Sequence, residues 1–125
     1  MADEQAADLV LIVISGPENP KRLPSAFFLS ATAAANEQKV VIYFTGPGTE
    51  LLKKGVAEAI HPLEGGQSLA DFMELAEDNG VEFIGCQQSL DLNGMTKDDL
   101  SRELPLLTPS QALPALGSAG RVLTW

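Results

Sequence analysis

The chain has 125 residues, of which 45% are hydrophobic and 20% are charged, and 17 acidic against eight basic residues give a net charge of −9. This is the composition of an ordinary globular chain, and its charge is too low to keep the chain disordered by self-repulsion. The acidic excess argues against nucleic acids and anionic membranes as partners, because both are bound through clustered Lys and Arg. The length predicts a single domain over residues 1–125.

The chain contains one cysteine and one histidine, which limits the chemistry available to it. One cysteine forms no internal disulfide, and one Cys with one His needs two further carboxylates to complete a zinc site, so we predict no metal. The apolar run Leu9–Ile14 is far shorter than the roughly 20 residues of a transmembrane helix. Because Asp3, Glu4 and Asp8 stand where a signal peptide is positively charged, we expect a cytoplasmic protein.

The first half of the chain predicts two buried strands, each followed by a helix. The strands are Asp8–Ser15 and Lys39–Thr45, and their continuous apolarity indicates burial on both faces, as in a parallel sheet. Gly46-Pro47-Gly48 is interpreted as a turn, because neither a P-loop nor a dinucleotide-binding fingerprint is present. Helices are predicted over Leu23–Asn36 and Thr49–Ile60.

The second half continues the alternation with shorter elements. Ser68–Asn79 has one apolar and one acidic face, and Ser68 with Asp71 predicts a capping box at its start. The acidic face is interpreted as solvated surface, with docking of a basic partner as the alternative. The remaining predicted elements are a strand at Val81–Gly85, a helix at Gln87–Leu92, a turn capped by Thr96 and Asp99, a strand at Leu104–Leu107, a helix at Pro109–Leu116 and a strand at Arg121–Trp125.

This alternation predicts an α/β fold with a mostly parallel five-stranded sheet and helices on both faces. We expect the strands near 8–15, 39–45, 81–85 and 121–125 to be mutually parallel. In such sheets ligands bind beyond the carboxyl ends of the strands. The residues that the sequence places there are our candidates for lining a pocket: Ser15, Gly16, Thr45, Gly46, Cys86 and Gln87.

Cys86 is the strongest nucleophile at these strand ends. It directly precedes a predicted helix, whose first N–H groups stabilise a thiolate and lower its pKa. We therefore expect a partly accessible, reactive thiol; the alternative is a buried structural cysteine. A phosphatase or sulfurtransferase acting on small anions is disfavoured, because no Lys or Arg lies between Lys54 and Lys97. His61 is either a partner of the thiol or a residue of a loop.

The segment Ser68–Leu100 resembles the DsrE-like family, which includes sulfur-relay subunits and YchN-like proteins. It carries a helix, Gly80-Val81, a short strand, Cys86, and then Gly94 and Asp99-Leu100. The resemblance implies a three-layer α/β/α sandwich and a homo-oligomer, with a trimer preferred. The apolar segments Leu104–Leu107 and Val122–Trp125 also favour association, because they supply more apolar surface than one short sheet edge hides.

In the sulfur-relay members of that family, a cysteine accepts sulfane sulfur as a persulfide and passes it to another protein. The resemblance implies that Cys86 is this cysteine and that the chain is a sulfur carrier, or sulfur transferase, that needs no cofactor. It would then exchange sulfur with a basic donor or acceptor protein. The alternative is a non-catalytic oligomeric module that binds a small ligand, with Cys86 lining the pocket.

Overall fold

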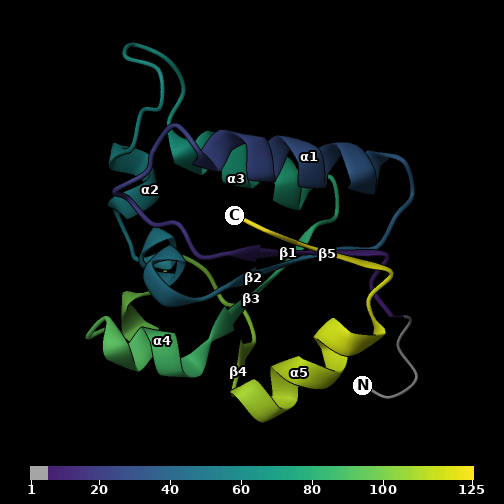
Figure 1. Ribbon diagram of the computed structural model, residues 1–125. Helices are drawn as coiled ribbons and strands as arrows, with labels where there is room; N and C mark the ends of the chain where they lie inside the picture. Colours follow the sequence, from purple (N-terminus) through teal and green to yellow (C-terminus); the bar gives the residue numbers. More distant parts are fainter. Residues whose placement is uncertain (1–5) are drawn as a thin grey trace.

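The computed structural model describes residues 6–125, so Asp3 and Glu4 lie outside the described residues. In this part of the chain five parallel strands form one sheet in the order β4-β3-β2-β1-β5 (Figure 1). The predicted α/β fold with a five-stranded parallel sheet is confirmed. The strands are β1 (Leu9–Val13), β2 (Val40–Phe44), β3 (Glu82–Cys86), β4 (Leu106–Leu107) and β5 (Arg121–Thr124).

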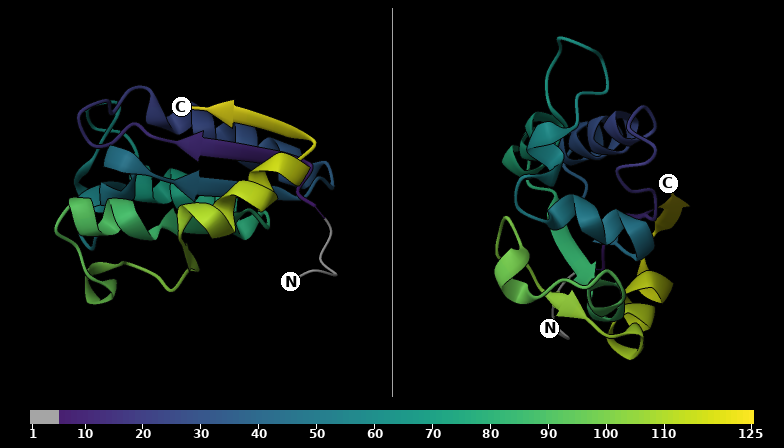
Figure 2. Two further views of the ribbon diagram at one scale, coloured as in Figure 1. Left: turned by 60° about the horizontal axis from the view of Figure 1, so that its bottom comes forward. Right: turned by 90° about the vertical axis from the view of Figure 1, so that its left-hand side faces the viewer.

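Helices cover both faces of the sheet and complete the predicted three-layer sandwich (Figures 1 and 2). One face carries α1, α2 and α3, and the opposite face carries α4 and α5. Short 3-10 helices, η1 and η2, lie in the connections. The helices are α1 (Leu23–Ala35), η1 (Gly46–Leu52), α2 (Val56–Ala59), α3 (Leu69–Asp78), α4 (Gln87–Leu92), η2 (Lys97–Asp99) and α5 (Pro109–Ser118).

Each face of the sheet has its own apolar core, which explains the continuous apolar runs of the central strands. Against α1 the rings of Phe27, Phe44 and Phe83 pack together, with Phe44 and Phe83 centroids 5.1 Å apart. On the other face a smaller cluster forms around Val10, Tyr43, Cys86 and Ala112. Cys86 therefore belongs to the layer that α5 covers.

The prediction of one helix over Thr49–Ile60 is wrong. The segment divides into η1 and the four-residue helix α2, and Gly46-Pro47-Gly48 begins η1. Between the two, Lys53 pairs with Leu100 in an antiparallel bridge, and Gly55 has a φ of 84°. This left-handed conformation interrupts a helix, and the bridge joins two segments that are distant in the sequence.

The remaining elements differ from prediction mainly in their ends. β4 has two residues instead of four, and α5 continues to Ser118. The capping box of Ser68 and Asp71 is confirmed, as is the capping of the η2 turn by Thr96 and Asp99. Within residues 6–125, no helix has the length and apolarity needed to span a bilayer.

Candidate functional site at the carboxyl end of β3

Cys86 lies where the chain leaves two neighbouring strands toward opposite faces of the sheet. After β2 the chain continues to α2 and α3 on one face, whereas after β3 it enters α4 on the other (Figure 1). Diverging exits from adjacent parallel strands create the crevice in which open α/β sheets bind ligands. Cys86 is the last residue of β3, and α4 begins at the next residue, as the sequence predicted.

The expectation of a partly accessible thiol is wrong, because Cys86 is only 5% exposed. Its neighbours come from distant parts of the chain: Leu107 of β4 pairs with it across the sheet, and Ala112 of α5 belongs to the same apolar cluster. The residues next to Cys86 in the sequence do not predict this burial, because Leu107 and Ala112 both follow the cysteine by more than twenty residues.

Hydrogen-bond donors surround the sulfur and change its acidity. Burial acts to raise the pKa of the Cys86 thiol, but hydrogen bonding by Ser89, Tyr43 and Thr45 outweighs it and lowers the pKa to about 7. Ser89 contributes through both its hydroxyl and its backbone N–H. The donors are neutral, in keeping with a sequence that has no Lys or Arg between residues 54 and 97. A substantial fraction of the thiol is therefore ionised at neutral pH.

Tyr43 remains a hydrogen-bond donor over the same range of pH. Burial raises the pKa of its phenol, and the hydrogen bond and the charge of Cys86 raise it further. The phenol consequently stays protonated when the thiolate forms, and its O–H can point at the sulfur.

Ser89 is held in place by the segment that follows β2. Its Oγ accepts a hydrogen bond from the backbone N–H of Gly46 at 2.8 Å and lies 3.1 Å from Oγ1 of Thr45. One turn further on, Nδ2 of Asn93 donates to the carbonyl of Gly46 at 3.0 Å. These contacts fix α4 against η1 and hold Ser89 beside the thiol.

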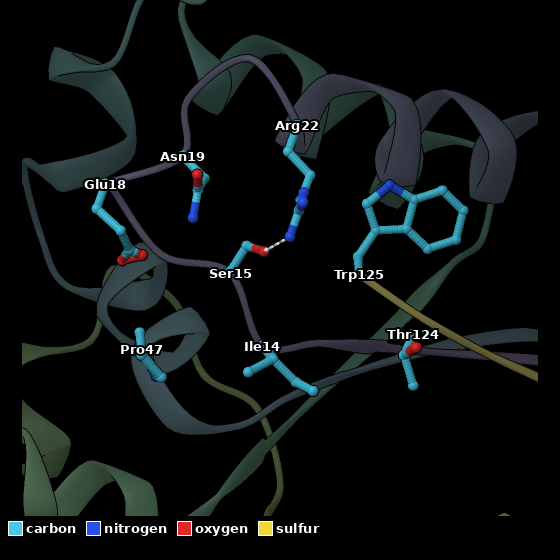
Figure 3. Close-up of a pocket in the computed structure, with 8 residues that line it drawn as sticks. All are labelled: Ile14, Ser15, Glu18, Asn19, Arg22, Pro47, Thr124 and Trp125. Carbon is cyan, nitrogen blue, oxygen red and sulfur yellow. Dashed lines mark hydrogen bonds between the residues drawn. The ribbon is translucent and has the colours of Figure 1, made fainter.

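The other pocket-lining candidates fall into two separate places. Thr45 and Gly46 contact Ser89 and so join the Cys86 site, whereas Ser15 lines a surface hollow beyond the ends of β1 and β5 (Figure 3). The N–H of Gly16 donates to the carboxylate of Glu18. Gln87 turns along α4, where its amide donates to Asp91 at 3.3 Å.

His61 is an exposed residue of the loop between α2 and α3. Its Nδ1 donates to the carbonyl oxygen of Gly66 at 3.0 Å. This contact favours the interpretation of His61 as a loop residue over that of a partner for the thiol. Across residues 6–125, the His, Cys, Asp and Glu side chains form no group of three or more that could hold a metal ion.

Sequence reasoning missed Tyr43 and Ser89 as residues of the site. Tyr43 was interpreted only as a residue of a buried strand, although the alternation of a strand places it on the same face as Thr45, two residues later. Ser89 was interpreted only as a residue of a short helix, although it lies three residues after Cys86 and therefore about one helical turn away. The strand and helix periodicities can both be seen in the sequence. However, only the pairing of β2 with β3 brings Tyr43 and Ser89 to the same sulfur.

The model of the DsrE/DsrF-like family matches residues 8–125. The chain belongs to the DsrE/DsrF-like family. Its resemblance to that family in sequence is thereby confirmed, and the match includes every strand of the sheet. No curated protein matches the chain.

Solved structures with the same fold are distant in sequence. YchN from E. coli superposes with a TM-score of 0.77 at 17% identity, covering 95% of this chain and 99% of that one. A protein of unknown function from Methanobacterium thermoautotrophicum gives 0.61 at 16% identity, with 94% and 96% covered. A conserved protein of unknown function from Bacteroides thetaiotaomicron gives 0.65 at 10% identity, with 94% and 95% covered. At these identities the likeness establishes the DsrE-like fold of this chain.

Proposed function

We propose that this protein carries sulfane sulfur as a persulfide on Cys86. The observation that carries the proposal is the place of the single cysteine: it ends β3, α4 begins at the next residue, and neutral donors beside it lower its pKa to about 7. The thiolate is the nucleophile in sulfur exchange, so a nearly buried thiol with this acidity is suited to attack a sulfane sulfur. Membership of the DsrE/DsrF-like family supports the same chemistry.

The two transfer steps balance without any oxidant or reductant. In loading, the Cys86 thiolate attacks the outer sulfur of a donor persulfide R–S–SH, a new S–S bond forms, and R–S⁻ leaves with the electron pair of the broken S–S bond. In unloading, an acceptor thiolate attacks the outer sulfur of Cys86–S–SH, and the Cys86 thiolate leaves in the same way. The persulfide proton stays on the outer sulfur throughout, and no metal or cofactor enters either step.

The donors around Cys86 assist both steps. In loading they keep the thiol ionised, and in unloading they stabilise the thiolate that departs, because a thiol of lower pKa leaves faster. The Ser89 hydroxyl and N–H and the Tyr43 phenol are positioning residues in this scheme. They stabilise negative charge on the sulfur without exchanging sulfur themselves.

Burial limits access to the thiol, so a small persulfide should load Cys86 slowly, and a partner protein that displaces the cover of Cys86 should load it faster. The helix nearest the thiol, α4, has only six residues, and its last residue, Leu92, is 85% exposed. An exposed leucine on a short element offers an apolar contact to a docking protein. The net charge of −9 favours a basic donor or acceptor for this encounter.

The proposal is tested by mass spectrometry of the intact protein after incubation with a low-molecular-weight persulfide. Wild-type protein is expected to gain the mass of one sulfur atom, and a reducing thiol should remove it. Cys86→Ser should gain nothing, which assigns the modification because the chain has no other cysteine. Wild-type protein that stays unmodified in its native state, yet reacts when unfolded, would overturn the proposal.

A further inference from the structure

A hollow in the surface lies away from Cys86, beyond the carboxyl ends of β1 and β5. Its volume is about 660 Å³, within the range of small-molecule sites, and its wall includes Ile14, Ser15, Asn19, Arg22 and Trp125 (Figure 3). The loop that follows β1 and the residue that follows β5 form opposite sides of it. Nothing in the persulfide chemistry proposed above uses these residues.

Arg22 supplies unused hydrogen-bond donors to the hollow. Its guanidinium makes one long hydrogen bond, 3.4 Å from Nη1 to Oγ of the buried Ser15. A guanidinium has five N–H donors, and in the described part of the chain no carboxylate forms an ion pair with it. Figure 3 shows the side chains of Asn19 and Arg22 directed from the loop toward Ser15. These donors suit a carboxylate, which pairs with Arg in a bidentate arrangement.

Trp125 forms the aromatic side of the hollow and is held rigidly. Its backbone N–H donates to Ile12 at 2.8 Å, and its carbonyl accepts from the N–H groups of Ile14 and Ser15. Its indole Nε1 donates to Oγ of Ser25 at 2.9 Å. A tryptophan fixed in this way, yet not buried, offers a planar surface at little entropic cost.

The loop that carries Arg22 is also organised in the absence of a ligand. Asn19 N–H donates to Gly16 and Arg22 N–H donates to Asn19, both at 3.1 Å. The Glu18 carboxylate lies in the same wall and accepts from the N–H of Gly16 at 2.9 Å. One arginine and one carboxylate in the same wall favour a ligand with a single negative charge, since a second anion would face Glu18.

We propose that this hollow is a binding site for a small aromatic carboxylate. The carboxylate pairs with Arg22 with help from Asn19 and Ser15, and the ring lies against Trp125. Benzoate is the simplest member of this class, and benzamide has the same shape without the charge.

The test uses the full chain labelled with ¹⁵N, because its single tryptophan gives a single indole N–H resonance. Titration with benzoate is expected to shift this resonance to saturation, whereas benzamide should bind at least about tenfold more weakly. Arg22→Gln should weaken benzoate binding about tenfold and remove the preference for benzoate over benzamide. Arg22 is exposed, so this variant is expected to fold, and an unchanged indole position without ligand checks that it does.

Two control variants separate the hollow from general charge effects and from the cysteine. Arg121→Gln removes an exposed arginine at the opposite end of β5 and should leave benzoate binding unchanged. Cys86→Ser should also bind benzoate normally, so failure of the persulfide function leaves this site intact. A resonance that benzoate does not shift, equal binding of benzamide, or equal weakening by Arg121→Gln would overturn the proposal.

Discussion

The backbone N–H of Gly46 donates to the hydroxyl of Ser89 at 2.8 Å. This hydrogen bond joins the start of η1, which follows β2, to α4, which follows Cys86. A serine hydroxyl has one proton and two acceptor lone pairs. Gly46 occupies one lone pair, and the Thr45 hydroxyl, 3.1 Å away, can donate to the other, which leaves the proton of Ser89 for the sulfur. The contact therefore connects the packing of η1 against α4 to the ionisation of the thiol.

Ser89→Ala should raise the pKa of Cys86 by about one unit, because it removes the hydroxyl donor and keeps the backbone N–H. At pH 7 the fraction of thiolate would fall about fivefold. The pH dependence of the ultraviolet absorbance of the thiolate measures this directly, since the chain has one cysteine. The exposed Ser101→Ala is the matched control and should titrate like wild type; an unchanged midpoint in Ser89→Ala would contradict the role given to Ser89.

Tyr43→Phe should also raise the pKa of Cys86 while preserving the apolar packing of the ring. The expected loss of stability is within about 1.5 kcal/mol, the usual net contribution of one hydrogen bond. The same absorbance titration reports the thiol, and denaturant unfolding reports the stability. If the phenol is a donor to the thiolate, the titration midpoint moves upward; a midpoint that moves downward is incompatible with that role.

Stability should rise with pH between about 7 and 9, and this rise should depend on Cys86. The pKa of the thiol is about 7 in the folded protein against its usual 9.0. Between these values the unfolded chain binds more protons than the folded one, so the free energy of unfolding increases with pH. Relative to Cys86→Ser, wild type should gain about 2 kcal/mol from pH 6 to pH 9.

Denaturant unfolding at several pH values measures this gain. Tyr43 does not interfere below about pH 9, because its phenol is protonated in both the folded and the unfolded chain. A difference between wild type and Cys86→Ser that stays constant with pH would show that the thiol is not acidified by folding.

Gly48→Ala should destabilise the fold strongly. A Cβ at this position would lie 2.2 Å from the carbonyl oxygen of Val13, so η1 could not pack against the end of β1. A cost of about 3 kcal/mol is expected, at the upper end for overpacking. The control is Gly117→Ala in α5, where a Cβ meets nothing within 4 Å and alanine should stabilise the helix by up to about 1 kcal/mol. Thermal unfolding measures both variants: Gly48→Ala should lower the melting temperature relative to wild type, and Gly117→Ala should raise it.

We propose that the protein is a homo-oligomer, with a trimer preferred from the family resemblance. β5 is an open edge of the sheet, with Val122 39% exposed, and on α5, which precedes it in the chain, Leu113 is 70% exposed. Open edge strands and exposed apolar side chains both favour association. Light scattering at micromolar concentration should give three times the mass of the protomer, and Val122→Lys should lower it. The mass of a single protomer for wild type would refute the proposal.

Patterns among neighbouring residues were enough to predict the order of the strands and the place of the cysteine. Continuous apolar runs specified β1 and β2 as strands buried on both faces, because apolarity without alternation leaves no face for solvent. The capping residues Ser68 and Asp71 specified the start of α3, since those contacts lie within one turn of the chain. The strand before Cys86 and the helix after it were likewise readable from neighbouring residues.

The surroundings of that cysteine could not be predicted in this way, because they come from distant segments of the chain. The pairing of β2 with β3 places Tyr43 and Ser89 beside the sulfur, and β4 and α5 bury it to 5% exposure. Ser15, which the sequence grouped with Cys86 because both follow strands, lies instead with Arg22 and Trp125. The physical reason is that acidity and burial depend on contacts made across the sheet, and residues far apart in the chain make those contacts only once it has folded.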